Sequence, residues 1–234
     1  MAIFITGGSG LLGRWLVPKT KECFSTVLAP THKEFDITKP RALPRGITTV
    51  VNLAAFVDVA ACQKDPLQAD LVNNRCLGWL TSFPETTQIY HISTDYVYNG
   101  WTLDSKEEDP LDPWCVYGRS KADGDTRLLS YSKPNIHIIR TSFKDVKWPY
   151  PGAFTDVYTN ADTVDIISEM ILQFILSKAP GGVYNIGTEA KSLYDLAKRN
   201  NTDVKAMSYY QGTYPTLRPC LTMDLVKFHE VMND

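Results

Sequence analysis

The chain has 234 residues, of which 24 are basic and 26 acidic, so its formal net charge is −2. This balance excludes a protein that binds nucleic acid or an anionic membrane through a global basic field. Hydrophobic residues make up 44% and charged residues 21%, which excludes a disordered or fibrous chain. We expect no membrane span, because no apolar run is long enough, and no secretory leader. The five cysteines are scattered without zinc spacing, which predicts reduced thiols in a cytoplasmic protein without a metal site.

Short apolar, β-branched runs alternate with helix-like stretches along the chain. Strands are expected at 2–6, 25–29, 48–54, 88–93, 135–140 and 182–186. Helices are expected at 11–19, 66–80, 116–129, 164–178, 193–199 and 223–232, with Asp162 and Thr163 capping the fourth and Ser192 the fifth. The alternation predicts an α/β fold built from βαβ units, a Rossmann-like doubly wound parallel sheet.

A glycine-rich segment, TGGSGLLG, lies between the first expected strand and the first helix. Gly7, Gly10 and Gly13 have the spacing of a tight turn, a close approach to phosphate and close packing of helix on strand. Free N–H groups at the helix start would hold a pyrophosphate. A turn that merely needs glycine is the alternative, but the strand-loop-helix context favours a dinucleotide site. A P-loop is excluded, because no Gly-Lys-Ser/Thr follows.

The segment after the second strand bears on the ribose of such a cofactor. NAD sites usually place Asp or Glu there, to bind the 2′-hydroxyl. This chain has APTHK at positions 29–33 instead, and Arg14, His32 and Lys33 would attract a 2′-phosphate. NADP(H) is therefore favoured, while Glu34 leaves NAD(H) open. Solvated turn residues are the alternative interpretation of this segment.

Tyr117 and Lys121 lie four residues apart, on one face of an expected helix. A neighbouring ammonium favours the phenolate of a group that otherwise titrates near about 10, which would let Tyr117 exchange a proton near neutral pH. Thr94 ends the strand before it and would offer a hydroxyl to the same substrate oxygen. The same spacing recurs at Tyr194 and Lys198, where no strand-end hydroxyl precedes it and a solvated lysine is expected.

Four segments, TGGSGLLG, VVNLAAFVDV, HISTDYVY and YGRSK, resemble the extended short-chain dehydrogenase/reductases that act on nucleotide sugars. The chain is most similar to the dTDP-4-dehydrorhamnose reductase family. Further matches are Asp36-Ile37-Thr38, Asn73 within 69–78, Arg140-Thr141-Ser142 and Arg218-Pro219. The resemblance implies NADPH-dependent reduction of the C4 keto group of a nucleotide-linked 4-keto-6-deoxy sugar, with Tyr117 protonating the new alkoxide.

The resemblance also implies roles for single residues. The catalytic set would be Thr94, Tyr117 and Lys121, with Lys121 also holding the nicotinamide ribose. Asp36 would accept a hydrogen bond from the adenine amino group, unless it only caps the turn that follows. With His32 included, the expected cofactor contacts are Gly7, Gly10, Leu11, Leu12, Gly13, Arg14, His32, Asp36, Ile37, Leu53, Ala54, Ala55, Asn73, Tyr117, Lys121 and Phe143.

Two parts are expected within one domain: a dinucleotide-binding part at 1–143, and a substrate loop and small lobe at 144–234 that includes a returning strand and helices. Residues 144–161 are predicted to form an ordered irregular loop. The stretch from 140 to 162 is shorter than in extended relatives, so a homodimer remains open as the source of missing pocket residues. The side chains that either contact the nucleotide or pack the loop are Trp148, Tyr150, Phe154, Tyr158 and Arg218.

Residue differences separate the related activities. Nucleotide-sugar dehydratases carry Asp and then Glu after the threonine, whereas here Asp95 is followed by Tyr96, so the base is missing. GDP-fucose-synthase-type epimerase/reductases place Cys at the position of Asp95. A simple reductase is favoured over an epimerase or dehydratase. A non-catalytic NADP-binding regulatory protein, like the regulatory subunit of methionine adenosyltransferase, is the other alternative; retention of Thr94, Tyr117 and Lys121 argues against it.

Overall fold

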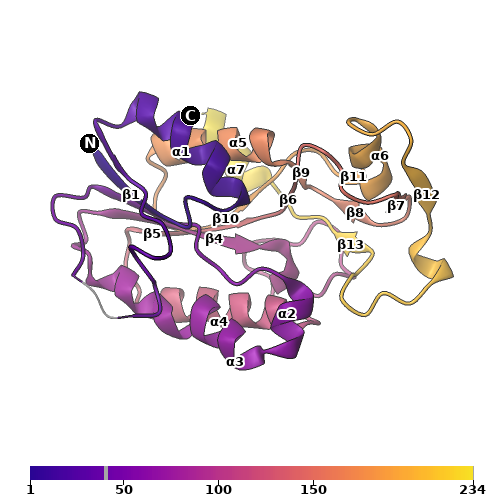
Figure 1. Ribbon diagram of the computed structural model, residues 1–234, viewed down its shortest axis with the longest axis horizontal. Helices are drawn as coiled ribbons and strands as arrows, with labels where there is room; N and C mark the ends of the chain where they lie inside the picture. The colour runs from indigo at the N-terminus through magenta and orange to yellow at the C-terminus, as the bar shows by residue number, and fades with distance from the viewer. Residues whose placement is uncertain (40–41, 234) are drawn as a thin grey trace.

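The computed structural model describes residues 1–39 and 42–233 and shows a parallel sheet between two layers of helices (Figure 1). In this described part the sheet has six strands in the order β10-β5-β4-β3-β1-β2, and every pairing is parallel. The chain moves outward in one direction from β1 and in the other from β3, which is the doubly wound arrangement that the alternation predicts. The strands are β1 (Ala2–Thr6), β2 (Thr26–Leu28), β3 (Thr49–Asn52), β4 (Gln88–Thr94), β5 (Ile136–Thr141) and β10 (Gly182–Ile186).

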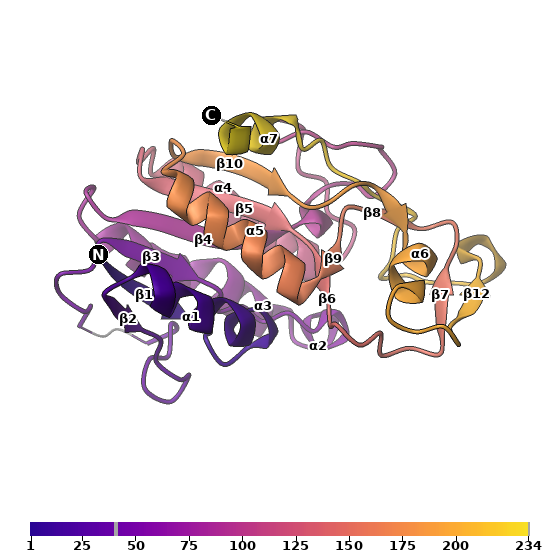
Figure 2. The same cartoon turned by 90° about the horizontal axis from the view of Figure 1, so that it is seen from above.

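Helices cover both faces of the sheet (Figure 1). One layer holds α1 (Leu11–Cys23), α5 (Val164–Ser177) and α7 (Val226–Asn233), and α1 and α5 lie side by side in it (Figure 2). The other layer holds α2 (Val59–Lys64), α3 (Pro66–Asn73), the 3₁₀ stretch η1 (Arg75–Ser82) and α4 (Val116–Ser130). On α5, Ile167, Ile171 and Phe174 have helical spacing and are fully buried. Burial of each such side chain stabilises the fold by about 1.5–3 kcal/mol.

The helices differ from the sequence-based expectations mainly in four places, and α1 also runs to Cys23, beyond its predicted end at residue 19. The helix predicted at 66–80 ends at Asn73 and continues as η1. Helix α2 lies outside the helix ranges given from the sequence, and Asp58 caps it by accepting a hydrogen bond from the N–H of Ala61. Thr163 precedes α5 but its side chain makes no capping hydrogen bond, contrary to expectation. The last helix begins at Val226 rather than at Met223, because residues 220–223 are drawn into extended pairing.

A smaller lobe lies beyond the carboxyl ends of the sheet strands (Figures 1 and 2). It contains α6 (Leu193–Lys198), which Ser192 caps as expected, and its core includes Trp148, Leu196 and Val204. Its short strands are β7 (Gly152–Phe154), β8 (Tyr158–Thr159), β11 (Lys191–Ser192), β12 (Lys205–Met207) and β13 (Cys220–Leu221), and β6 (Phe143–Lys144) pairs with β9 (Asp162–Thr163) where the lobe joins the sheet. The prediction that 144–161 is irregular is therefore wrong in part, since β7 and β8 pair with strands later in the chain. The domain boundary at residue 143 stays a prediction.

Candidate functional site

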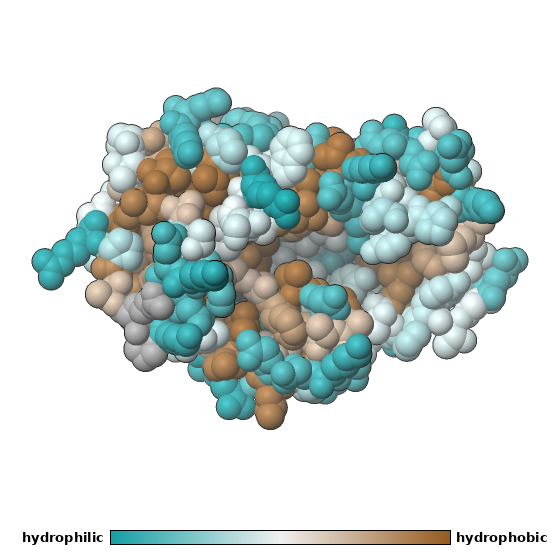
Figure 3. Space-filling model, in the orientation of Figure 1, coloured by the Kyte–Doolittle hydropathy of each residue, from teal (hydrophilic) through white to brown (hydrophobic). Residues whose placement is uncertain are grey.

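A cavity of about 680 Å³ opens at the carboxyl ends of β1, β3, β4 and β5, and the surface is recessed in this region (Figure 3). The cavity includes the point between β1 and β3 where the strand order reverses, which is where open α/β sheets bind ligands. The glycine loop, the segments after β2 and β3, and the start of α4 form its walls. The fold therefore places the motifs that are far apart in sequence around one space.

Most of the predicted site residues line this cavity. They are Gly7, Gly10, Leu11, Leu12, Gly13, His32, Asp36, Ile37, Leu53, Ala54, Ala55, Thr94, Tyr117, Lys121 and Phe143. Arg14 and Asn73 are not part of the lining. Arg14 is exposed on α1. The buried Asn73 amide instead accepts a hydrogen bond from the Phe56 N–H and donates to the Phe56 carbonyl and to Ser120, so it holds the cavity wall from behind.

Sequence reasoning missed several lining residues, among them Gln68, Asp95, Ser142 and Lys144. Asp95 and Ser142 lie inside motifs that the sequence analysis quoted, so their place in those motifs could have identified them as site residues. Gln68 and Lys144 carried none, because their place in the wall depends on how α3 and β6 pack.

The glycine loop is fitted closely to its surroundings. The N–H of Gly10 donates to the carbonyl of Gly7 at 2.9 Å, and Gly7 has a φ of +71°. A Cβ on Gly13 would lie 2.5 Å from the Gly7 carbonyl oxygen, and one on Gly7 would lie 2.7 Å from the Ala54 nitrogen. Helix α1 starts at this turn without a side-chain cap. Its first N–H groups can therefore serve an anionic group such as a phosphate.

The two carboxylates that follow β2, those of Glu34 and Asp36, accept hydrogen bonds from nearby threonines. Glu34 accepts hydrogen bonds from the N–H and the hydroxyl of Thr31, at 2.8 and 2.9 Å. Asp36 accepts from the hydroxyl and the N–H of Thr38, at 2.7 and 3.0 Å, and these bonds lower the pKa of the Asp36 carboxyl. The capping role that the sequence left open for Asp36 is thus present, and Asp36 also lines the cavity.

Tyr117 and Thr94 line the cavity on the side of β4, which β3 separates from β1 and the glycine loop. Burial raises the pKa of the Tyr117 phenol above its ordinary value, and a hydrogen bond with Thr94 offsets part of this rise. The sequence analysis expected Lys121 to favour the phenolate, which stays a prediction; in the structure desolvation has the largest effect on the Tyr117 pKa, and Asp95 also raises it. Tyr117 therefore keeps its proton at neutral pH, which is the form that a proton donor needs.

Lys121 is 1% exposed, and its Nζ donates to the Ile92 carbonyl at 2.7 Å. The same Nζ lies 3.1 Å from Nε2 of His91. Burial lowers the pKa of Lys121 to about 8, although Asp125 and Cys76 act in the opposite direction. The ammonium is therefore the main form at neutral pH, with the neutral amine within reach.

Asp95 and Lys144 form a second polar group at this end of the cavity. Asp95 accepts a hydrogen bond from the Thr94 hydroxyl at 3.0 Å. Burial raises the pKa of the Asp95 carboxyl to about 6, while Lys144 and Ser142 act to lower it. Burial also lowers the pKa of Lys144. The end of the cavity near Tyr117 therefore offers hydrogen-bonding groups suited to a hydroxylated ligand.

None of the lobe aromatics named from the sequence, nor Arg218, lines the cavity in the described structure. Trp148 is 7% exposed and belongs to the lobe core, so packing is its role. The guanidinium of Arg218 lies 5.4 Å from the ring centroid of Trp101 and 5.5 Å from that of Trp114. Phe154 packs against the same core, and Tyr150 and Tyr158 are exposed.

Residues 1–39 and 42–233 contain no group of three or more His, Cys, Asp or Glu placed to hold a metal ion. Within the same ranges, every helix is too short or too polar to cross a bilayer.

A sheet of this order, with Thr94, Tyr117 and Lys121 around a cavity at its switch point, is typical of the extended short-chain dehydrogenase/reductases. Residues 1–169 match the family model described as "RmlD substrate binding domain". The chain therefore belongs to the family of the RmlD substrate binding domain, which confirms the resemblance drawn from its motifs.

Named relatives agree with this assignment. The spore coat polysaccharide biosynthesis protein SpsK of Bacillus subtilis is 37% identical over 151 residues, which cover 60% of this chain and 52% of that protein. A dTDP-4-dehydrorhamnose reductase of Aggregatibacter actinomycetemcomitans is 35% identical over 208 residues, which cover 84% of this chain and 67% of that protein. The matched region thus spans about half the length of the first of these relatives.

Solved structures confirm the fold. A hypothetical dTDP-4-dehydrorhamnose reductase from Sulfolobus tokodaii superposes with a TM-score of 0.81 at 23% identity, covering 98% of this chain and 94% of that one. A dTDP-4-dehydrorhamnose reductase from Bacillus anthracis in complex with NADP gives 0.78 at 18% identity, covering 98% and 92%. MoeE5, solved with UDP-glucuronic acid and NAD, gives 0.75 at 17% identity over 100% of this chain and 93% of that one.

Proposed function

We propose that this protein uses NADPH to reduce the C4 keto group of a nucleotide-linked 4-keto-6-deoxy sugar, and that Tyr117 donates the proton. One observation carries the proposal: a single cavity joins the glycine loop at one end to Thr94, Tyr117 and Lys121 at the other. The names of the relatives, which include several dTDP-4-dehydrorhamnose reductases, support the substrate class.

The residues present fit a dinucleotide. A Cβ at Gly7 or Gly13 would collide with backbone, so this tight turn requires glycine, and the first N–H groups of α1 have no side-chain cap and are free to bind a diphosphate. The cofactor, when bound, supplies the hydride. The protonated phenol of Tyr117 then gives its proton to the new alkoxide oxygen, and Thr94 orients that oxygen. Lys121 holds the nicotinamide ribose, and Asp95 accepts a hydrogen bond from the sugar.

The reaction is tested by following nicotinamide absorbance with NADPH and, in parallel, dTDP-linked and GDP-linked 4-keto-6-deoxyhexoses. We expect NADPH oxidation with one of the two nucleotide sugars and none in the Tyr117→Phe variant. Tight NADPH binding without turnover on either sugar would contradict the proposal and favour a non-catalytic dinucleotide-binding protein. Turnover that persists in Tyr117→Phe would remove Tyr117 from the mechanism.

We expect the protein to bind NADPH at least about tenfold more tightly than NADH, since one charge-assisted hydrogen bond to the 2′-phosphate is worth about 1.5–3 kcal/mol. His32 lines the cavity, Arg14 and Lys33 are exposed nearby in sequence, and Glu34 is hydrogen-bonded to Thr31. The measurement is the Kd of each cofactor by fluorescence titration.

The ratio of the NADH Kd to the NADPH Kd should fall in the double variant Arg14→Gln/Lys33→Gln, which lacks both exposed charges. It should also fall as ionic strength rises, because salt screens exposed charges. Lys21→Gln, a charge change in the last turn of α1, serves as the control and should leave the ratio of the two Kd values unchanged. Equal Kd values in the unmodified protein would contradict the prediction.

A further inference from the structure

A row of buried polar side chains lies behind Lys121. The Thr6 hydroxyl donates to Oδ1 of Asn52 at 2.5 Å, Nδ2 of Asn52 lies 2.9 Å from Nδ1 of His91, and Nε2 of His91 lies 3.1 Å from Nζ of Lys121. Each of these four residues is at most 1% exposed.

Strand register creates this row. Thr6 on β1 pairs with Asn52 on β3, and Asn52 pairs with His91 on β4, so the three side chains stand level on adjacent strands. Lys121 reaches the end of the row from α4, which packs on this face of the sheet. The row therefore ends at Lys121, which lines the cavity of the candidate active site.

The His91 ring is neutral. Burial holds the pKa of His91 well below its usual value, and the charge of Lys121 adds to this effect. A neutral imidazole carries one proton, so one ring nitrogen donates and the other accepts. The groups facing the Lys121 ammonium are His91, Asp125 and Cys76, of which Asp125 and Cys76 act to raise the pKa of Lys121.

Two arrangements of hydrogen bonds are open to the row, and both give each nitrogen of the His91 ring a partner. When Lys121 is an ammonium, it donates to Nε2 of His91, so Nδ1 bears the proton and donates to the amide oxygen of Asn52 after a half-turn of that side chain. Nδ2 of Asn52 then donates to the Thr6 hydroxyl, which no longer donates to Oδ1. When Lys121 is a neutral amine, its lone pair accepts from Nε2–H, and Nδ1 accepts from Nδ2 of Asn52 while Thr6 donates to Oδ1. The second set has the Asn52 orientation seen in the structure.

We propose that His91 is a positioning residue for Lys121, and that its ring changes tautomer when Lys121 gains or loses a proton. In each state Lys121 keeps one N–H on the Ile92 carbonyl and has one left for the cavity. The net change is the loss of one proton from Lys121 to water. The His91 ring loses a proton at Nδ1 and gains one at Nε2, both by exchange with water, and remains neutral.

A change of tautomer is favourable because it avoids leaving buried polar groups without a hydrogen-bond partner. A buried donor or acceptor left without a partner costs about 1–3 kcal/mol. Because His91 can accept from Lys121 or donate to it, Nζ of Lys121 and both ring nitrogens keep a partner in each state, so Lys121 changes protonation without that cost at its own end of the row. The significance of this for catalysis rests on the proposed reduction, in which Lys121 and the proton donor Tyr117 line the same cavity.

The tautomer is tested by ¹⁵N NMR of the ring nitrogens of His91 in the whole unmodified protein, which requires no substrate. Spectra are compared at about pH 6.5 and about pH 9.5, on either side of the pKa of about 8 for Lys121. We expect the proton on Nδ1 at the lower pH and on Nε2 at the higher one. The same tautomer at both values, or a doubly protonated ring at pH 6.5, would overturn the proposal.

A second measurement follows the ¹³Cε signal of Lys121, assigned by its loss in Lys121→Met. In His91→Leu the pKa of Lys121 should fall by about one unit, because the ammonium loses an acceptor, and His91→Gln should restore it. The matched control is His137→Leu. His137 is also fully buried in the sheet but bonds to the carbonyls of Ile89 and Ala179, so its loss should not move the Lys121 titration.

An unchanged Lys121 titration in His91→Leu would contradict the positioning role. If His91→Leu does not fold, the tautomer measurement on the unmodified protein still decides. A confirmed tautomer change in a protein that reduces neither nucleotide sugar would support the row of hydrogen bonds while contradicting the proposed function.

Discussion

Replacement of the Tyr117 phenol in Tyr117→Phe is expected to reduce kcat by about 10²- to 10⁴-fold, the usual contribution of a general acid. Tyr117 lines the cavity on α4, and burial holds its pKa above the ordinary value, so the phenol is protonated and ready to donate. The ring remains in the variant, and it packs edge-on to Tyr96 at 5.9 Å between centroids. The Kd for NADPH should therefore change little. Stopped-flow absorbance and cofactor titration measure the two quantities.

The matched control is Tyr194→Phe, which removes a hydroxyl from the second Tyr-x-x-x-Lys pair. Tyr194 lies on α6 in the lobe, with Nζ of Lys198 5.7 Å from its ring centroid. Its loss should leave kcat unchanged. An equal loss of activity in both variants would mean that the effect of Tyr117→Phe is not specific to the site. Because the pKa of Tyr117 is raised, its deprotonation should not reduce activity below about pH 10.

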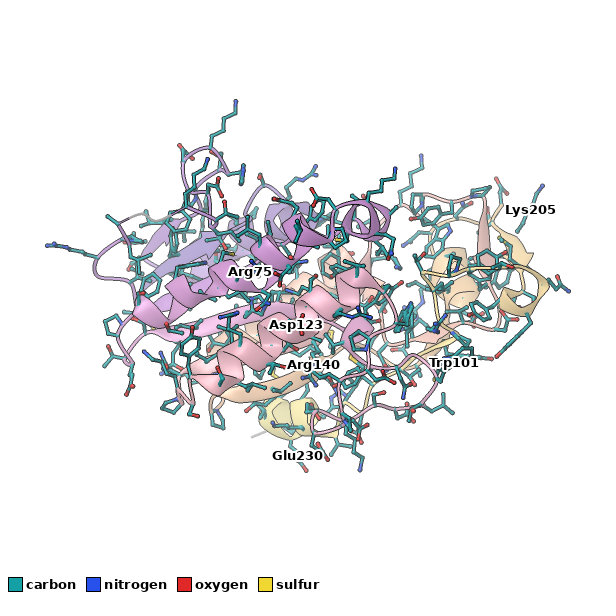
Figure 4. The ribbon with its side chains drawn as sticks, turned by 90° about the horizontal axis from the view of Figure 1, so that it is seen from below. Arg75, Trp101, Asp123, Arg140, Lys205 and Glu230 are labelled. Atoms are coloured by element: carbon teal, nitrogen blue, oxygen red, sulfur yellow. The ribbon has the colours of Figure 1, made fainter. Side chains whose placement is uncertain are left out.

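Loss of the Arg140 guanidinium in Arg140→Met is expected to destabilise the fold by about 3–5 kcal/mol, because it removes the ion-pair partner of the buried Asp125 carboxylate. Arg140 is 2% exposed and Asp125 fully buried, and Nε of Arg140 lies 3.1 Å from Oδ2 of Asp125. Nη1 of Arg140 also donates to the hydroxyl of Tyr98 at 2.8 Å and to the carbonyl of Glu107 at 3.0 Å. Figure 4 shows Arg140 close to α4, the helix that carries Asp125. The free energy of unfolding is measured with urea.

The sign of the pH dependence follows from Asp125. Burial raises the pKa of its carboxyl, and Arg140 acts to lower it. Without Arg140 the folded pKa rises further, so the variant binds more protons when folded and regains stability, relative to the unmodified protein, as the pH falls. Glu169→Gln is the control: its pair with Lys19, at 2.6 Å, has side chains 49% and 28% exposed, and its loss should cost less than about 1 kcal/mol. Similar losses in both variants would contradict the argument.

The sequence alone determined the parts of the molecule that depend on local pattern. Each predicted sheet strand is present, because β-branched apolar runs bounded by turn residues favour a buried strand whatever surrounds them. The glycine loop, Thr94, Tyr117 and Lys121 were found for a similar reason: each occupies a strand end or helix start, and parallel strands bring their carboxyl ends to one edge.

The tertiary structure decided what depends on partners distant in sequence. β7 and β8 form because β12 and β13 arrive from later in the chain, and the helix predicted at 66–80 is interrupted where the Asn73 side chain binds Phe56 and Ser120. Desolvation, which depends on tertiary packing, has the largest effect on the pKa of Tyr117 and raises it. The row behind Lys121 arises from strand register, which joins residues that share no motif. Burial and strand register depend on many contacts between residues that are far apart in the sequence, so no local pattern of residues encodes them.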